Sequence, residues 1–203
     1  MPLKPTPLPT LAGRRRTLRR LSTLTASIVL GALGAGASRP ARADVIVVKS
    51  AEVRAEEDDY VLNAEFDLNI NSTLEEALQR GVPLYFLLEF EVTRPRWYWL
   101  DEKVLSSQTQ YRIAWNALTQ QYRVSSGLFA QTLYSLDEVD RFLSRVTSRP
   151  VARRDQLQPG TQYDAALRLR LDVNQLPKPF QVNALTSREW TLQSDWYRWS
   201  FTA

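Results

Sequence analysis

Two segments of the chain alternate apolar and polar side chains with a period of two. In residues 60–71 the apolar positions are Tyr60, Leu62, Ala64, Phe66, Leu68 and Ile70, and the positions between them are mainly polar. In residues 163–174 they are Tyr163, Ala165, Leu167, Leu169, Leu171 and Val173. Successive side chains of a strand point to opposite faces. Both segments are therefore expected to be strands with one buried and one solvated face, as in antiparallel sheets.

Other segments have weaker strand patterns, and two have helix signals. Further strands are expected over residues 45–55, 84–93, 107–116 and 121–133, with one or two more in 188–201. Capping boxes at residues 72–75 and 135–138 predict helices over 73–80 and from about 136 to 147. Residues 117–120 are expected to connect a hairpin. The acidic run 56–59 is interpreted as a solvated turn, because it lacks the spaced ligands and the glycine of a calcium loop.

These elements predict a mainly β fold. We expect an antiparallel β-sandwich of about seven strands with two short packing helices, formed by residues 44–203 as a single domain. No glycine-rich linker divides this segment, and its length suits one hydrophobic core.

The first 43 residues have the three-part layout of a secretory signal peptide. Five arginines between positions 14 and 20 precede an uncharged segment, residues 21–37, and a small-x-small site ends at Ala43. We expect cleavage after Ala43 and a periplasmic mature protein that does not span the membrane. The alternative is a retained anchor in the inner membrane, which the short, glycine-containing apolar segment disfavours.

The net charge changes sign once this segment is set aside. The whole chain has 26 basic and 22 acidic residues, and eight of the basic residues but none of the acidic ones lie in residues 1–43. The remaining 18 basic and 22 acidic residues give a formal charge of −4, which disfavours nucleic-acid binding. The chain also has no cysteine and no histidine. It therefore lacks the residues for a Ser-His-Asp triad, a thiolate or imidazole zinc site, or a disulfide, and we expect no cofactor.

Residues 94–100, RPRWYWL, concentrate aromatic and basic side chains after the strand expected at 84–93. If that strand continues without interruption, its parity buries Tyr98 and Leu100 and exposes Trp97 and Trp99. A bulge at Pro95 would reverse the pattern and bury both tryptophans. In residues 195–201, Tyr197, Trp199 and Phe201 share one face of an expected strand. The aromatic and basic side chains of these two segments predict a candidate binding surface of Arg94, Arg96, Trp97, Trp99, Trp196 and Arg198. The alternative is that the rings fill the core.

A second candidate surface is basic, and its residues are Arg141, Arg145, Arg149, Arg153 and Arg154. Arg141 and Arg145 are expected to share a helix face, where they also complement the helix dipole. The cluster could alternatively dock anionic lipid headgroups or an acidic partner.

Glu89 and Glu91 are the candidate pair for carboxylate chemistry. They lie two residues apart on one expected strand, and therefore on one face. Glycoside hydrolysis needs two carboxylates on opposite sides of the substrate, a geometry that strand neighbours supply poorly. We interpret the pair as part of a solvated sheet face, with a glycoside hydrolase as the less favoured alternative.

The C-terminal third contains a block with a family resemblance. Residues 171–182, LDVNQLPKPFQV, resemble the LD-x-x-x-LPKP-hydrophobic-Q block of the bacterial DUF4390 family, which are exported proteins with no established activity, cofactor or catalytic residue. Supporting segments are 111–115, 118–124, 190–192 and 196–197. Genes of this family tend to lie beside a sensor histidine kinase, which implies an envelope role linked to signalling. Physically, Pro177 and Pro179 predict a rigid extended corner.

Together these features predict a non-enzymatic protein-binding module of the cell envelope. Its expected partner is another envelope protein, and the resemblance points to a sensor kinase. The alternative is a glycan- or peptidoglycan-binding module with exposed aromatic rings. The sequence indicates neither the ligand nor the oligomeric state.

Overall fold

The structure is a computed structural model that describes residues 46–98 and 100–203. Within these residues it has nine strands, three α-helices and three 3₁₀ turns. The strands are β1 (Val47–Glu56), β2 (Asp59–Asp67), β3 (Leu84–Arg94), β4 (Glu102–Asn116), β5 (Gln121–Ser126), β6 (Phe129–Leu133), β7 (Arg145–Arg153), β8 (Gln162–Leu171) and β9 (Tyr197–Thr202). The helices are α1 (Ser72–Gln79), α2 (Leu136–Leu143) and α3 (Lys178–Thr186), and the 3₁₀ turns cover Arg154–Gln156, Val173–Gln175 and Arg188–Trp190.

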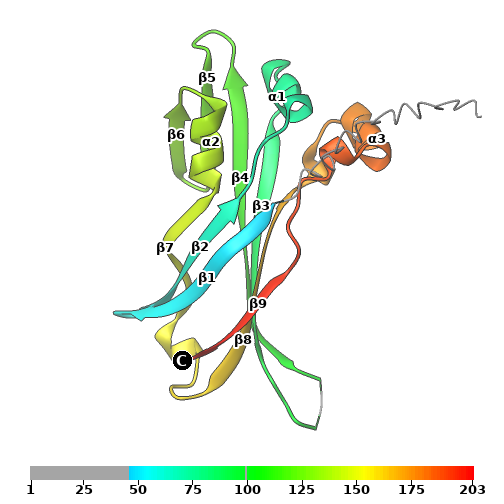
Figure 1. The fold of residues 1–203 in the computed structure, drawn as a ribbon. Helices are drawn as coiled ribbons and strands as arrows, with labels where there is room; N and C mark the ends of the chain where they lie inside the picture. Colours follow the sequence, from blue (N-terminus) through cyan, green and yellow to red (C-terminus); the bar gives the residue numbers. More distant parts are fainter. Residues whose placement is uncertain (1–45, 99) are drawn as a thin grey trace, which may run out of the picture. The chain divides into compact units, whose positions relative to one another are not determined.

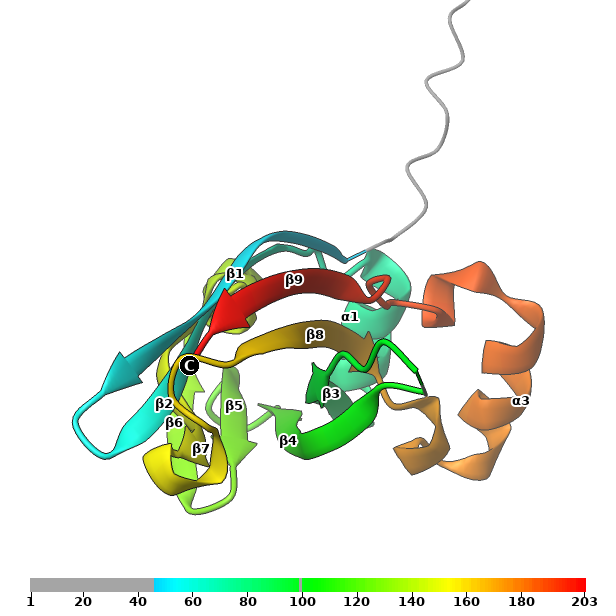
Figure 2. The same cartoon turned by 90° about the horizontal axis from the view of Figure 1, so that it is seen from below.

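The strands form two antiparallel sheets (Figure 1). One sheet has the order β1-β2-β7, and the other has the order β6-β5-β4-β3-β8-β9. On one side the sheets meet, because β1 lies beside β9 in both views and Tyr60 contacts Phe201 with ring centroids 6.5 Å apart (Figure 2). On the other side α2 packs between the first strands of the large sheet and β7, through Phe142 against Tyr111.

The core follows the alternation of the sequence. The expected apolar positions of β2, β3 and β8 are all buried, and the central ones, such as Phe66, Phe86 and Leu167, are at most 2% exposed. Helix α1 adds Leu74, Ala77 and Leu78 to the same cluster. The predicted mainly β, antiparallel fold is confirmed, although seven strands was too low a number.

The difference in strand number arises between residues 121 and 153. Residues 121–133 form two strands, because Gly127, with φ of +58°, makes a turn between β5 and β6. Residues 145–153 form β7, whereas we expected the preceding helix to continue to about residue 147. Helix α2 instead ends at Leu143, and Arg145 begins the edge strand of the small sheet. The expectation that Arg141 and Arg145 share a helix face was therefore wrong.

The proline block begins a helix and is not an extended corner. Pro177 caps α3 and Pro179 lies in its first turn, where the missing N–H of proline removes no helical hydrogen bond. The Gln181 amide turns back and donates to the carbonyls of Asn174 (2.8 Å) and Leu176 (2.7 Å). The conformation expected for this segment was therefore wrong, but the block does redirect the chain after β8.

The N-cap of α1 is also displaced by one residue. Asn71 Oδ1 accepts a hydrogen bond from the Leu74 amide at 3.0 Å, so Asn71 is the cap that the sequence placed at Ser72. In α2 the cap is the expected Ser135. The segment interpreted as a signal peptide, with its cleavage site at Ala43, lies outside the described residues. None of the helices in the described part of the chain is long and apolar enough to cross a membrane.

Candidate functional site

The RPRWYWL segment forms the end of the β3–β4 hairpin and is not the continuation of a strand. β3 ends at Arg94, and Trp97 and Tyr98 lie in a turn. Trp97 is 94% exposed, Tyr98 66% and Leu100 81%, while Trp99 lies outside the described residues. Neither of the two alternatives for this segment is right: a continuous strand would have buried Tyr98 and Leu100, and a bulge at Pro95 would have buried Trp97, whereas all three are exposed. The ladder of β3 stops before these residues, so strand parity no longer decides where their side chains point.

The two arginines of this segment are both bound to Glu102. Arg94 contacts the carboxylate through two nitrogens, and the Arg96 guanidinium lies 2.5 Å from the same oxygen. Hydrogen bonds from Arg94 and Arg96 hold the pKa of Glu102 below its usual value. The arginines therefore brace the base of the hairpin loop, and neither ion pair covers the exposed Trp97 and Tyr98.

Trp196 and Arg198 lie elsewhere: Arg198 is in β9, the edge strand of the large sheet beside β8, and Trp196 directly precedes that strand. β9 pairs Arg198 with Ala166, and Arg168 stacks over the Trp196 ring with its guanidinium carbon 4.6 Å from the ring centroid. By register Arg168 lies opposite Glu89, five residues before Arg94 in β3. Five residues of strand span about 17 Å. The five described residues of the first candidate surface therefore belong to two separate regions.

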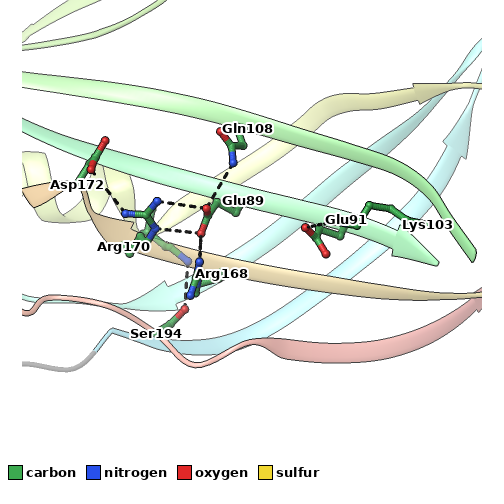
Figure 3. Close-up of polar contacts among 9 residues, drawn as sticks. Glu89, Glu91, Lys103, Gln108, Arg168, Arg170, Asp172 and Ser194 are labelled. Atoms are coloured by element: carbon green, nitrogen blue, oxygen red, sulfur yellow. Dashed lines mark hydrogen bonds and ion pairs between the residues drawn. The ribbon is translucent and has the colours of Figure 1, made fainter. Parts of the chain in front are cut away.

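Glu89 is the centre of a charged cluster on the outer face of the large sheet (Figure 3). Its side chain is buried, with Oε2 accepting hydrogen bonds from Arg168 Nε at 2.8 Å and from Arg170 Nε at 3.1 Å. Arg170 also lies 3.7 Å from Asp172. Glu91 shares the face, as predicted, but pairs separately with Lys103 at 2.7 Å.

The electrostatics of Glu89 are those of a permanent anion. Burial raises its pKa, but the hydrogen bonds and charges of Arg170 and Arg168 outweigh burial and leave the pKa below its usual value. A general acid needs a raised pKa, and a nucleophile needs a free oxygen. Glu89 has neither property in this arrangement, which is that of a structural ion-pair cluster.

A groove of about 610 Å³ lies between β4 and β7, beside α2 and the β5–β6 turn. Its lining residues are Gln108, Thr109, Gln110, Tyr111, Ser126, Gly127, Phe129, Phe142, Arg145, Val146, Thr147 and Arg149. Phe129 and Phe142 are stacked, with centroids 6.0 Å apart and planes 5° apart. The lining combines three aromatic rings and two guanidinium groups, and it contains no acidic residue.

Two strand edges border this groove. β3 pairs with β4 from Glu102 to Ile113, but β5 pairs only with Arg112–Asn116, so the segment of β4 before Arg112 has no strand on that side in the described part of the chain. β7 is likewise an edge strand, paired only with β2. In antiparallel strands, alternate backbone groups point away from the existing partner. Both walls of the groove therefore present backbone hydrogen-bonding groups that no neighbouring strand in the described residues uses.

The predicted basic cluster is divided by the fold. Arg145 and Arg149 line the groove, and among the described residues neither forms an ion pair. Glu65 is the strand partner of Arg145 in the β2–β7 register, but the two side chains form no ion pair. The other three have separate contacts: Arg141 donates to the Asp137 carbonyl, Arg153 pairs with Asp155, and Arg154 lies over the Tyr60 ring.

Tyr111, Phe129 and Phe142 are the groove residues that the sequence analysis did not assign to a site. Phe142 was expected in a helix, and the other two were expected in strands. Burial raises the pKa of Tyr111, and Arg149 beside its hydroxyl partly opposes that rise. Had a strand been predicted over residues 145–153, Arg145 and Arg149 would have been expected on a sheet edge. The helix predicted to about residue 147 covered the start of this strand.

The described residues include no group of three or more carboxylates placed to hold a metal ion. A family model described as "Domain of unknown function (DUF4390)" matches residues 43–200. No curated protein and no solved structure matches the chain.

Proposed function

The chain belongs to the DUF4390 family, a domain of unknown function, and from that premise we propose that it is a non-enzymatic binding module for an extended, acidic segment of another protein. The groove between β4 and β7 is the proposed binding site. The observation that carries the proposal is the combination of two free strand edges with Arg145 and Arg149, neither of which forms an ion pair with a carboxylate in the described residues.

Each feature of the groove supplies a different part of the recognition. An unpaired strand edge can accept an extended peptide through main-chain hydrogen bonds, which give affinity but little sequence preference. Aromatic rings of the groove, chiefly Phe129 and Phe142, offer apolar contact to alternate side chains of such a peptide. Arg145 and Arg149 favour carboxylates between those positions, because guanidinium groups bind carboxylates with two hydrogen bonds.

Glycan binding has less support in the geometry. A flat sugar platform needs accessible ring faces, and Arg168 occupies one face of the Trp196 ring. Trp97 is exposed but meets Tyr98 with the ring planes 73° apart, so these two rings do not form one flat platform. Hydrolysis by Glu89 and Glu91 is disfavoured because Arg168 and Arg170 already bind the Glu89 carboxylate. In the groove, by contrast, Arg145 and Arg149 form no ion pair with a carboxylate in the described residues, although Arg149 lies beside the Tyr111 hydroxyl.

The expected ligand is a segment of an envelope protein. This rests on the export signal inferred for residues 1–43 and on the family resemblance, which makes a membrane-anchored sensor kinase the specific candidate. We propose a periplasmic location for residues 44–203 on the same grounds.

Site-specific photo-crosslinking in the native envelope tests the proposal. A photoreactive amino acid at Gln110, in the groove, should crosslink to a partner protein, whereas one at Leu118, in the exposed β4–β5 turn, should not. The double substitution Arg145→Glu and Arg149→Glu should reduce the Gln110 crosslink at least about tenfold, since each charge-assisted hydrogen bond contributes about 1.5–3 kcal/mol. Arg153→Glu is the matched control, since Arg153 lies on the same strand outside the groove and already pairs with Asp155. An undiminished crosslink in the folded double variant would contradict the proposal.

A further inference from the structure

The β3–β4 hairpin loop presents several exposed apolar side chains close together in the chain. Trp97, Tyr98 and Leu100 are 94%, 66% and 81% exposed, and the only ring contact of Trp97 in the described residues is with its neighbour Tyr98, at 5.1 Å. Exposed apolar groups that gather at one place mark protein or membrane interaction sites. These three residues, with Arg94, Arg96 and Lys103 at the base, are called the hairpin tip below.

The hairpin tip lies beyond the rest of the large sheet. β8 pairs with β3 only as far as Thr93, while β3 and β4 continue to the Arg94–Glu102 pair. In Figure 1 the β3–β4 hairpin diverges from the ends of β8 and β9. The tip is therefore a convex projection. It offers a partner protein little area, whereas a bilayer surface can receive it from the end.

The residue types of the tip match the layers of a bilayer surface. Tryptophan and tyrosine favour the interface between headgroups and acyl chains, and leucine favours the acyl region. The arginines at the base can keep their charges at headgroup level while their stems follow the apolar surface, and Lys103 at the same level pairs with Glu91. Glu102 holds both Arg94 and Arg96 at that level.

The charge of the tip also differs from that of the domain. Residues 94–103 contain three basic and two acidic side chains, a formal charge of +1, while residues 44–203 carry −4. An approach to an anionic bilayer is thus least opposed when the tip faces the lipid.

We infer that the hairpin tip docks the protein on an anionic phospholipid bilayer by inserting Trp97, Tyr98 and Leu100 into its interface. This inference is independent of the groove. It makes the protein peripheral to a membrane through a surface loop.

The absence of cysteine from the chain allows a direct test. Tyr98→Cys and Leu118→Cys in the full chain each provide one labelling site for an environment-sensitive fluorophore, at the tip and at the opposite end of β4. With vesicles of phosphatidylethanolamine and phosphatidylglycerol, the label at 98 should shift to the blue and be quenched by lipids that carry a spin label in the acyl chain. The label at 118 should do neither. Because both proteins carry the same residues 1–43, the difference between the labels reports on the tip alone.

A second variant tests the residues involved. Adding Trp97→Asp and Leu100→Asp to the Tyr98→Cys protein should weaken vesicle binding at least about tenfold and abolish the quenching. Both side chains are exposed, so a normal thermal unfolding curve is expected and shows that the fold is intact. Equal quenching at 98 and 118, or none at 98, would overturn the inference. So would a tip label that responds to lipid-free envelope proteins and not to vesicles, since the tip would then be a protein-binding site.

Discussion

For Glu89 the sequence predicted the face of the sheet correctly but not the burial of the side chain. The sequence parity placed it on the outer face of the sheet, where it is found, but predicted a solvated position. It is instead 7% exposed, because Arg168 and Arg170 from the neighbouring strand cover it. Cross-strand pairing is not visible in the spacing of one strand, so no pattern within β3 could reveal these partners.

This burial predicts a specific cost of removing the charge. Glu89→Gln should lower the free energy of unfolding by about 2–3 kcal/mol, since two partly buried guanidinium groups lose their counterion. Glu91→Gln should change it by less than about 1 kcal/mol, because the Glu91–Lys103 pair is more exposed. Urea unfolding of both variants at neutral pH measures the difference. Equal losses would contradict the assignment of Glu89 as a structural anion.

Asp140 of α2 predicts a dependence of stability on pH. Burial, together with the charges of Asp137 and Glu75, raises its pKa to about 6 against the hydrogen bond that it accepts from the Ile70 amide. Between pH 4 and 6 the folded state therefore binds more protons at this site than the unfolded state. Its contribution to stability is full below about pH 4 and is lost as the pH rises through 6.

Asp140→Asn isolates this contribution, because asparagine keeps an oxygen for the Ile70 amide and does not titrate. Relative to the original protein, the variant should gain about 1–2 kcal/mol in unfolding free energy between pH 4.5 and 7, a figure reduced for the partial exposure of the site. Chemical unfolding at both pH values gives the comparison. A constant difference between the two proteins would show that Asp140 titrates normally.

At the scale of elements, the N-terminus of α1 is capped by Asn71 and not by Ser72, the cap that the sequence predicted. Asn71→Ala should destabilise the protein by about 1–2 kcal/mol, because Asn71 caps the Leu74 amide and its Nδ2 also donates to the Glu189 carbonyl at 2.8 Å. Ser72→Ala should cost less than about 0.5 kcal/mol, although Ser72 was the cap that the sequence indicated. Thermal unfolding of the pair measures this. A larger loss for Ser72→Ala would restore the capping box of the sequence.

The elements that the sequence predicted well are those in which burial alone sets the pattern. β2, β3 and β8 each have one face buried in the core. The alternation of apolar and polar residues therefore predicted both the strand and which of its side chains are buried. β7 and α3 were missed for identifiable reasons. The apolar positions of 136–146 continue a helical stripe past Leu143, and Pro177 and Pro179 are compatible with either an extended corner or a first helical turn. The groove depends on how β4, α2 and β7 pack together, which no local pattern contains.

At the scale of the whole folded unit, residues 46–203, β4 connects the two proposed surfaces. Its first residue, Glu102, holds the base of the hairpin tip, and its segment from Gln108 to Tyr111 lines the groove. Eight residues of strand, from Glu102 to Gln110, span about 26 Å. A protein docked through the tip would therefore hold the groove above the bilayer, within reach of the membrane-proximal segments of an anchored partner.

Because the two surfaces share no side chain, their effects should be separable. Arg145→Glu with Arg149→Glu should leave the vesicle affinity within about twofold, and Trp97→Asp with Leu100→Asp should leave the Gln110 crosslink unchanged when the partner is supplied in detergent. Substitutions this far apart in the sheet act additively unless a conformational change couples them. The measurement is a four-protein comparison, with the original chain, each double variant and their combination tested in both assays. A loss of crosslinking in detergent caused by the tip substitutions alone would show that the two sites form one surface and would contradict their separation along β4.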